Sequence, residues 1–250
     1  MPANETTVIL KMINNSVGGT ALPGNDLAID DITFRPCGPS TIVSFSNSAQ
    51  VDSLTICEGS SATLFGNLST GFNTPNYRWQ SSTDNGTSWT DIASSNVLQL
   101  PVTPAITGIS RTIHYRMVAG DGNNINSANC RISSNKIILT IRILPTGGIS
   151  GDSICPGQSG NITFTSSSLN SPFTISYSDG TGTLIANNMT NNGKIATGVL
   201  FNNKTYTLLS IKDALGCERT NGFNPSTADI EIRKSNFNAP SSPLSVCETK

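Results

Sequence analysis

The sequence predicts an all-β protein made of tandem β-sandwich modules. Along many short stretches apolar residues alternate with polar ones at a period of two, which is the pattern of half-buried strands. No stretch keeps a helical apolar period over three turns. A cysteine-led motif also recurs at intervals of 98 and 92 residues. A repeat of that length, with about seven short strands, is typical of a β-sandwich.

The repeat opens with similar residues each time. The three openings are Leu54-Thr-Ile-Cys57-Glu-Gly, Ser153-Ile-Cys155-Pro-Gly and Leu244-Ser-Val-Cys247-Glu. The chain therefore divides into four parts. They are a remnant of another domain over 1–38, a first module over 39–143, a second module over 144–234, and a linker with the start of a third repeat over 235–250. The linkers between modules are short, which favours a semi-rigid string.

Each module contains enough strand signals for a sandwich. In the first module we expect strands at 62–65, 77–80, 89–92, 97–100, 113–118 and 137–143. In the second module we expect strands at 161–164, 173–177, 205–209 and 229–233. Asn and Gly fill the connections, as tight turns require. Trp79 stands on the strand that usually carries the core tryptophan of such sandwiches, so we expect it between the two sheets.

Composition excludes two kinds of partner. The chain has 250 residues and a formal net charge of −1, so it has no positive excess with which to neutralise nucleic-acid phosphates. Its longest apolar stretches, such as Ile137-Ile138-Leu139, are far shorter than the roughly 20 residues of a membrane helix. We therefore expect no nucleic-acid partner and no direct membrane insertion. The 33 Ser, 29 Thr and 27 Asn supply solubility without charge.

The cysteines indicate an oxidising compartment. Six cysteines are spread along the chain without a Cys-x-x-Cys pair, which argues against zinc and for disulfides. We therefore expect a secreted or cell-surface protein. Met1 is followed by neither a basic region nor an apolar one, so we expect no signal peptide here and expect the chain to be a fragment of an exported protein.

The cysteine pairing is open to two interpretations. Each complete module owns two cysteines, which favours the pairs Cys57–Cys130 and Cys155–Cys217 within modules. In a standard sandwich, however, the first turn and the last loop lie at opposite ends, beyond the roughly 7 Å that a disulfide spans between Cα atoms. The alternative is pairing between neighbours, Cys37–Cys130 and Cys57–Cys217.

A short motif in the first module offers a candidate binding residue. Ser82-Thr-Asp84-Asn-Gly86-Thr-Ser-Trp89 matches the Asp-box pattern of sialidase propellers, which suggests a glycosidase. A propeller needs one such motif per blade, and the sequence holds a single copy. We therefore interpret the motif as a hairpin turn with the tryptophan packed beneath it. Trp89 either packs there or forms an exposed platform on which a sugar ring stacks.

The sequence shows no catalytic constellation. His114 is the only histidine, and it alternates with Ile113, Tyr115 and Met117, so we expect His114 to face solvent while these three face the core. No Gly-x-Ser-x-Gly elbow or phosphate loop occurs, and the carboxylates are scattered over predicted turns. We therefore expect a protein that is not an enzyme and that requires no cofactor.

Several motifs resemble those of large surface proteins of Bacteroidetes. The stretch Gly24-Asn-Asp-Leu-Ala-Ile-Asp-Asp-Ile-Thr-Phe34-Arg-Pro-Cys37 resembles the last strand of their MAM-like jelly-roll domains. The first module resembles their immunoglobulin-like repeats through Cys57-x-Gly59, Tyr77-x-Trp79-Gln, Asp84-x-Gly86-x-x-Trp89-Thr-Asp and Tyr115-Arg. The second module is similar through Cys155-Pro-Gly, Tyr206 and Asp213-Ala-Leu-Gly-Cys217.

The resemblance implies tandem immunoglobulin-like β-sandwiches preceded by the C-terminal strands of a jelly-roll domain. It implies export by the type IX system and a link to adhesion or gliding motility. It also implies a calcium ion in the jelly-roll remnant, because such domains often hold one near the Asp-Asp-Ile strand and clustered oxygen donors suit this ion. The candidate ligands are Asn25, Asp26, Asp30 and Asp31.

These observations predict a non-enzymatic structural or adhesive segment of a bacterial cell-surface or secreted protein, in which tandem modules act as a stalk or display array. The expected partners are neighbouring repeats of the same chain and an extracellular ligand, either a glycan or a protein. The alternative is an accessory region of a secreted hydrolase that captures a substrate or carbohydrate.

Overall fold

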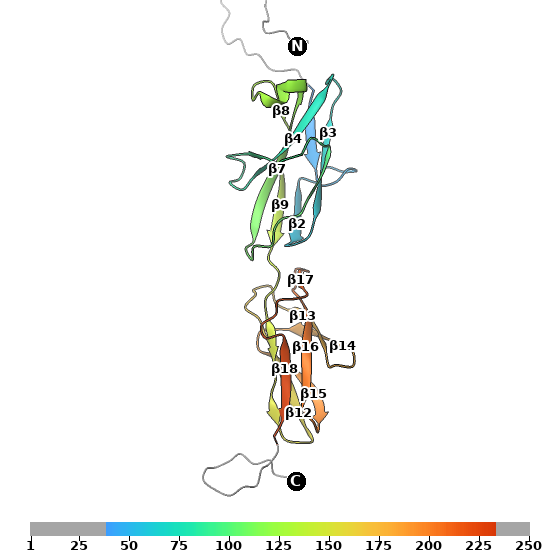
Figure 1. Cartoon of the computed structure of the whole chain (residues 1–250), viewed down its shortest axis with the longest axis vertical. Helices are drawn as coiled ribbons and strands as arrows, with labels where there is room; N and C mark the ends of the chain where they lie inside the picture. The colour runs from blue at the N-terminus through green and yellow to red at the C-terminus, as the bar shows by residue number, and fades with distance from the viewer. Residues whose placement is uncertain (1–38, 234–250) are drawn as a thin grey trace, which may run out of the picture. The chain divides into compact units, whose positions relative to one another are not determined.

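The computed structural model describes residues 39–233, which form two β-sandwiches (Figure 1). The first contains strands β1 to β9 and a short 3-10 helix, η1, and the second contains β10 to β18. In this described part no helix is long and apolar enough to cross a membrane. The predicted jelly-roll remnant and the start of the third repeat lie outside the described residues.

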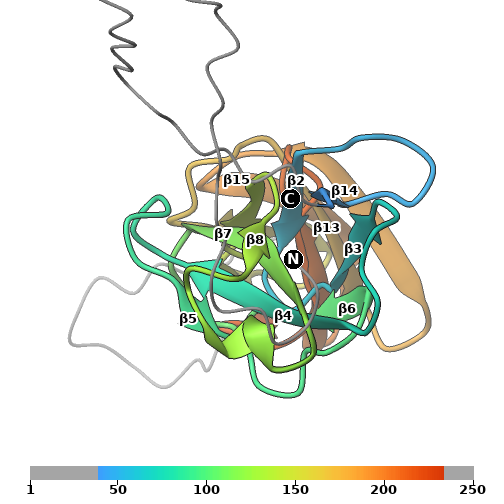
Figure 2. The same ribbon diagram turned by 90° about the horizontal axis from the view of Figure 1, so that it is seen from above.

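In the first sandwich a three-stranded sheet packs against a six-stranded sheet. The small sheet has the order β1-β3-β6, and the large one has the order β2-β9-β7-β4-β5, with β8 paired to β7. Figure 2 shows β3 and β6 on one side and β4, β7 and β8 on the other. Strand β2 runs parallel to β9, whereas the other pairs are antiparallel. The elements are β1 Thr41–Ser44, β2 Ser53–Cys57, β3 Ala62–Leu68, β4 Pro75–Ser82, β5 Thr90–Asp91, β6 Gln99–Val102, β7 Arg111–Asp121, η1 Gly122–Asn126, β8 Ile132–Ser133 and β9 Ile137–Arg142.

Alternating side chains of the facing strands fill the core of the first sandwich. Strand β9 shows the pattern most clearly, because Ile137, Leu139 and Ile141 are fully buried while the residues between them are half-buried. Trp79 is also fully buried, as the sequence predicts, and its indole N–H donates to the carbonyl of Val97 at 2.8 Å. The ring therefore fills the core without leaving its donor unpaired.

The second sandwich repeats this arrangement. Its sheets have the orders β10-β12-β15 and β11-β18-β16-β13-β14, with β17 paired to β16, and β11 runs parallel to β18. Phe164 and Phe173 meet edge to face in its core, with ring centroids 5.6 Å apart. The strands are β10 Gly148–Ser150, β11 Ser153–Ile154, β12 Gln158–Thr165, β13 Phe173–Ser178, β14 Thr183–Met189, β15 Gly193–Leu200, β16 Lys204–Lys212, β17 Glu218–Arg219 and β18 Thr227–Ile232.

The fold class predicted from the sequence is confirmed for the described residues. Both sandwiches have the strand order of an immunoglobulin-like fold, with a first strand that is divided between the two sheets. Each strand that the sequence predicts is present, with ends that differ by up to a few residues. The sequence did not predict the β14–β15 hairpin or the short strands β1, β2, β8, β10, β11 and β17.

Candidate functional site at the module junction

A disulfide joins the two sandwiches. Cys57 ends β2, Cys217 directly precedes β17, and their sulfurs are bonded with the Cα atoms 5.5 Å apart. The two cysteines are 160 residues apart in the sequence. Pairing between neighbours is therefore confirmed for Cys57–Cys217. The other neighbour pair, Cys37–Cys130, is wrong, because Cys130 carries a free thiol. Pairing within modules, Cys57–Cys130 and Cys155–Cys217, is wrong.

The length of β7 explains why the pairing within the first module fails. Cys57 pairs with Arg142 on β9, next to the β9 residue that faces Arg111 at the start of β7. Strand β7 then runs for 11 residues to Asp121, and Cys130 follows that far end. At about 3.3 Å per residue the strand is about 33 Å long, several times the reach of a disulfide.

The other cysteines differ in state. Within the described part of the chain Cys130 carries a free, exposed thiol. Cys155 is disulfide-bonded. Cys37 and Cys247 lie outside the described residues.

The residue after Cys57 anchors a loop of the first sandwich. The side chain of Glu58 is fully buried, and its Oε1 accepts hydrogen bonds from the N–H groups of Thr107 at 2.8 Å and Gly108 at 3.0 Å. The hydroxyl of Thr107 donates to the same oxygen at 3.1 Å. Gly59, with a φ of 79°, lets the chain turn directly after this carboxylate. The loop between β6 and β7 is thus tied to the turn that follows the disulfide.

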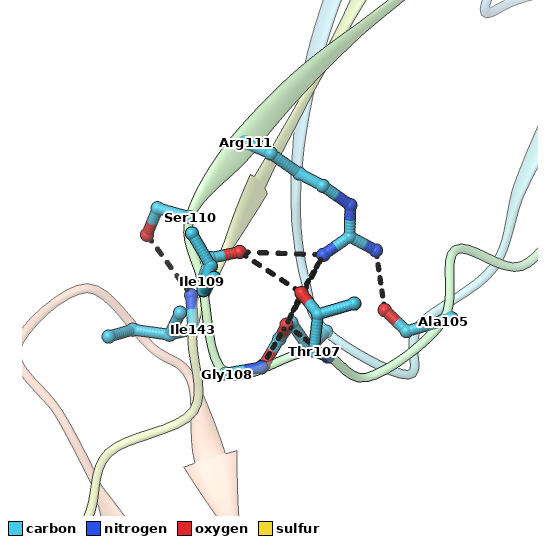
Figure 3. A network of polar contacts seen from close by, with 8 residues as sticks. Ala105, Thr107, Gly108, Ile109, Ser110, Arg111 and Ile143 are labelled. Atoms are coloured by element: carbon cyan, nitrogen blue, oxygen red, sulfur yellow. Dashed lines mark hydrogen bonds and ion pairs between the residues drawn. The ribbon is translucent and has the colours of Figure 1, made fainter. Parts of the chain in front are cut away.

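Arg111 completes this network (Figure 3). Its guanidinium lies 3.4 Å from Glu58 Oε1 and donates to the hydroxyl of Thr107. It also donates to the carbonyls of Ala105 and Ile109. The ion pair between Arg111 and Glu58 therefore holds the β6–β7 loop on both sides of Thr107, at Ala105 and at Ile109.

The network keeps Glu58 ionised. Burial acts to raise the pKa of the Glu58 carboxyl, but the hydrogen bonds from Thr107, Gly108 and Arg111 outweigh burial, and the pKa lies below its ordinary value of 4.5. Its second oxygen, Oε2, is buried without a hydrogen-bond partner among residues 39–233. All the hydrogen bonds to the Glu58 carboxylate therefore reach Oε1, and they come from the β6–β7 loop and Arg111.

The connection between β9 and β10 is short and is held from both sides. The N–H of Ile143 donates to the hydroxyl of Ser110 in the first sandwich at 3.4 Å (Figure 3). The Nε of Arg219 in the second sandwich donates to the carbonyl of Pro145 at 2.5 Å. Leu144 lies between these two attachments. The backbone between the two sandwiches is therefore free of these hydrogen bonds only at Leu144.

Comparison with known proteins gives a matching family and distant structural neighbours. Residues 46–142 match a family described as a domain of unknown function, DUF8696. No curated protein is significantly similar to the chain.

Three solved structures are distantly similar to this chain. The fibronectin(III)-like modules of CbhA from Clostridium thermocellum are 12% identical with a TM-score of 0.33, and the match covers 81% of this chain and 100% of that one. The FN1–FN3 domains of chicken CNTN1 are 14% identical with a TM-score of 0.34, over 71% and 65%. A Ca²⁺-stabilised adhesin of an Antarctic bacterium that binds ice is 11% identical with a TM-score of 0.40, over 78% and 49%. The chain thus spans less than two thirds of the chicken and Antarctic structures.

The Asp-box motif forms a hairpin, as predicted. Strand β4 pairs with β5, and Asp84 in the turn accepts hydrogen bonds from the hydroxyl of Ser82 at 2.6 Å and from the N–H of Ser88 at 2.9 Å. These bonds lower the pKa of Asp84 well below its ordinary value. Gly86 takes a φ of 88°, which the turn requires.

Trp89 is half-buried beside this hairpin. The guanidinium of Arg116 lies 4.2 Å from the ring centroid, and a Cβ built on Gly86 would lie 3.2 Å from the ring. Arg116 thus covers one ring face through a cation–π contact. The predicted role of Trp89 in binding stays a prediction.

His114 does not face solvent, and this prediction is wrong. The side chain is buried, 6% exposed, although Tyr115 and Met117 lie in the core as predicted. The central position of β7 explains the burial, because His114 is flanked by Ser82 on β4 and Ile138 on β9. Burial lowers the pKa of His114 below 6.5, the charge of Lys136 lowers it further, and the charge of Asp84 opposes both.

The predicted calcium ligands Asn25, Asp26, Asp30 and Asp31 lie outside the described residues. Between residues 39 and 233 no group of three or more His, Cys, Asp or Glu side chains is placed to hold a metal ion.

Sequence reasoning missed Glu58 and Ser110. A signal for Glu58 was present, because glutamate follows the cysteine in the first repeat opening and again at Glu248 in the third, whereas Pro156 replaces it in the second. Ser110 is one of many serines, and nothing in the sequence distinguishes it.

Proposed function

We propose that this chain is a non-enzymatic structural segment of a secreted or cell-surface protein, in which immunoglobulin-like sandwiches act as a stalk or display array. The observation that carries the proposal is the Cys57–Cys217 disulfide, because it links two consecutive modules rather than the sheets of one module. A bond between modules adds little to the packing of either core. Its direct effect is to restrict how one module moves against the next.

The peptide connection supports the same role. The anchored residues Ile143 and Pro145 shorten the free linker to Leu144, so the two modules are joined by one short covalent path and one disulfide. Two sandwiches joined at two separate points rotate less freely against each other than two sandwiches joined by the peptide connection alone. Such a joint suits a spacer that must hold a distal domain away from its anchor.

The disulfide also protects the array against stretching. When the chain is pulled at its ends, the load passes from Cys57 to Cys217 through the sulfurs and bypasses the chain between them, which spans a sequence separation of 160 residues. At about 3.3–3.6 Å per extended residue this stretch would otherwise release roughly 550 Å. Most of the two sandwiches therefore cannot be drawn out while the bond is intact.

The same disulfide supports the proposed extracellular location. Structural disulfides persist in oxidising compartments and are rare in the cytosol. Antibodies against residues 39–233 should label intact cells of the source organism or detect the protein in the culture medium. Detection in the cytosol alone would contradict the proposal.

Relaxation measurements test the joint itself. In the oxidised full chain, ¹⁵N relaxation should give one rotational correlation time for residues of both sandwiches. In the double variant Cys57→Ser/Cys217→Ser each sandwich should give a shorter, separate value. The variant Ser60→Ala, an exposed change beside Cys57, is the matched control and should behave as the parent chain. Separate correlation times in the oxidised parent chain would overturn the proposal.

A second candidate is an accessory region of a secreted hydrolase that captures a glycan. The half-exposed ring of Trp89 beside Arg116 favours it, because sugars stack on aromatic rings near polar groups. Affinity electrophoresis against a panel of soluble polysaccharides would compare the parent chain with Trp89→Ala and Trp89→Phe. Retarded migration that Trp89→Ala abolishes and Trp89→Phe retains supports this candidate. Migration that Trp89→Ala leaves unchanged excludes this site.

A further inference from the structure

Strand β14 is a free edge of the large sheet in the second sandwich. It stands at the end of the strand order, and among residues 39–233 it pairs only with β13 (Figure 1). The strand is seven residues long. An edge strand carries alternate N–H and C=O groups that no neighbour in its own sheet satisfies. Another strand can therefore add to the sheet at this edge.

The corresponding edge of the first sandwich is protected against such pairing. There β5 is only two residues long, and its Asp91 forms an ion pair with Arg78 at 2.8 Å. Short edge strands and charged side chains both hinder pairing with another chain. The edge strand β15 of the second sandwich carries Lys194, and its register with β12 shifts, which marks a bulge. Strand β14 contains no charged residue and is longer than β5.

The first part of β14 is regular and apolar. Residues 183–186 pair with β13 in an unbroken register, and the register shifts only beyond them. Ile185 is 65% exposed and Leu184 is 42% exposed. Ala186 packs against the core, so Leu184, two positions away, belongs to the inner face of the sheet and Ile185 to the outer face. Exposed apolar side chains therefore occur on both faces of the sheet at this edge.

The charge pattern fits a second copy of the same strand. No charged side chain occurs between Asp179 and Lys194. When two identical strands pair about a twofold axis, each residue meets a residue of the same stretch in the other copy. A charged strand would place like charges opposite one another, which destabilises a strand pair. The uncharged β14 avoids this repulsion.

We propose that two copies of this chain associate side by side through antiparallel pairing of their β14 strands, with Ile185 of one copy opposite Ile185 of the other. The twofold axis is then perpendicular to the sheet, and the two large sheets continue as one. Each residue meets a residue on the same face, so Leu184 lies opposite Ala186. This register covers the most exposed apolar side chain of the strand. The inference goes beyond the proposed function, because a stalk needs no lateral partner.

The pairing of two short strands should be weak. It buries much less than the roughly 1,200 Å² that a stable protein–protein interface needs. We therefore expect a dissociation constant between about 10 μM and about 1 mM. Copies held close together on one surface would pair readily, because their effective concentration is raised.

Sedimentation velocity of the full chain tests the pairing. Every chain carries Cys130→Ser, so that this exposed thiol cannot link two copies. Between about 10 μM and about 1 mM the chain with Ile185 intact should pass from monomer to dimer. Ile185→Lys and Ile185→Glu should each stay monomeric, because like charges would then lie opposite one another. An equimolar mixture of these two variants should dimerise again, because Lys then lies opposite Glu.

The matched control is Val199→Lys, which places the same charge at an exposed residue of the other long edge strand, β15. This variant should dimerise as the parent chain does. At about 1 μM, where all chains are monomers, the urea midpoints of parent and variants should agree, so that loss of the dimer is separated from loss of the fold.

Three results would overturn the inference. The first is a parent chain that stays monomeric up to about 1 mM. The second is a dimer that persists in Ile185→Lys, or that Val199→Lys disrupts equally. The third is a mixture of the Lys and Glu variants that stays monomeric, because Ile185 then does not lie opposite itself. None of these results affects the Cys57–Cys217 joint, so the proposed function would stand.

Discussion

The sulfur of Cys57 in the first sandwich is bonded to the sulfur of Cys217 in the second, 160 residues further along the chain. The next residue, Glu58, ties a loop of the first sandwich to the same turn through Thr107 and Arg111. The disulfide and the Glu58 carboxylate therefore hold the same turn, the one that follows β2. The bond fixes where the turn lies, and the carboxylate keeps the turn attached to its own sandwich.

Removal of the junction disulfide should lower the stability of the fold as well as uncouple the motions of the two sandwiches. In Cys57→Ser/Cys217→Ser the unfolded chain regains the conformational freedom of a long closed loop, so we expect the free energy of unfolding to fall by about 2–4 kcal/mol. Urea unfolding followed by fluorescence checks this for the first sandwich, which contains both tryptophans, Trp79 and Trp89. Ser60→Ala should stay within about 0.5 kcal/mol of the parent chain. Equal stability of the parent chain and the double variant would count against a structural bond.

Neutralising the buried carboxylate should weaken the first sandwich. Glu58→Gln keeps the shape of the side chain but removes the charge that faces Arg111, so we expect a loss of about 1–3 kcal/mol in the free energy of unfolding. The matched control is Glu231→Gln, which changes an exposed glutamate of the second sandwich and should cost less than about 0.5 kcal/mol. Similar effects of the two changes would argue that the loop does not depend on Glu58.

Glu58 should also contribute to acid sensitivity. Its pKa in the folded chain lies below the ordinary 4.5, so the unfolded chain takes up the proton first as pH falls. The stabilising contribution is complete above pH 4.5 and is lost as pH falls from 4.5 through the folded value. Urea midpoints between pH 6 and pH 3 should therefore fall more steeply for the parent chain than for Glu58→Gln. Parallel curves would contradict this assignment.

His114 should govern stability in a higher pH range. Its pKa in the fold lies below 6.5 because of burial and the charge of Lys136, so the unfolded chain binds the proton first as pH falls below 6.5. Stability should be constant above this value and should decline as pH is lowered toward 5. Since His114 is the only histidine, His114→Gln should remove most of this decline in urea midpoints. Lys136→Gln should weaken it, and a decline that persists in His114→Gln would refute the assignment.

Strand positions were predictable where burial alternates. Strand β9 has buried Ile137, Leu139 and Ile141 at a period of two, and the sequence shows that pattern directly. Strand β14 does not show this pattern, because Leu184 and Ile185 are adjacent and both exposed, and its one buried residue, Met189, stands at its end. An edge strand whose outer residues face solvent leaves little apolar periodicity to detect.

The features that depend on tertiary position were harder to predict. Whether two cysteines meet depends on the strand length between them, and the 11 residues of β7 exclude Cys57–Cys130. The burial of His114 depends on neighbours from β4 and β9, which alternation along its own strand does not reveal. The role of Glu58 depends on a loop about 50 residues away in sequence.

Pulling single molecules from both ends tests the mechanical role most directly. In the oxidised full chain the segment between Cys57 and Cys217, a sequence separation of 160 residues, should stay out of the load path. The extended length should therefore be shorter by about 550 Å than in Cys57→Ser/Cys217→Ser. Addition of a reductant to the oxidised chain under load should release this length. If the oxidised parent chain extends to the same length as the variant, the disulfide carries no load between modules and the account of a locked array is wrong.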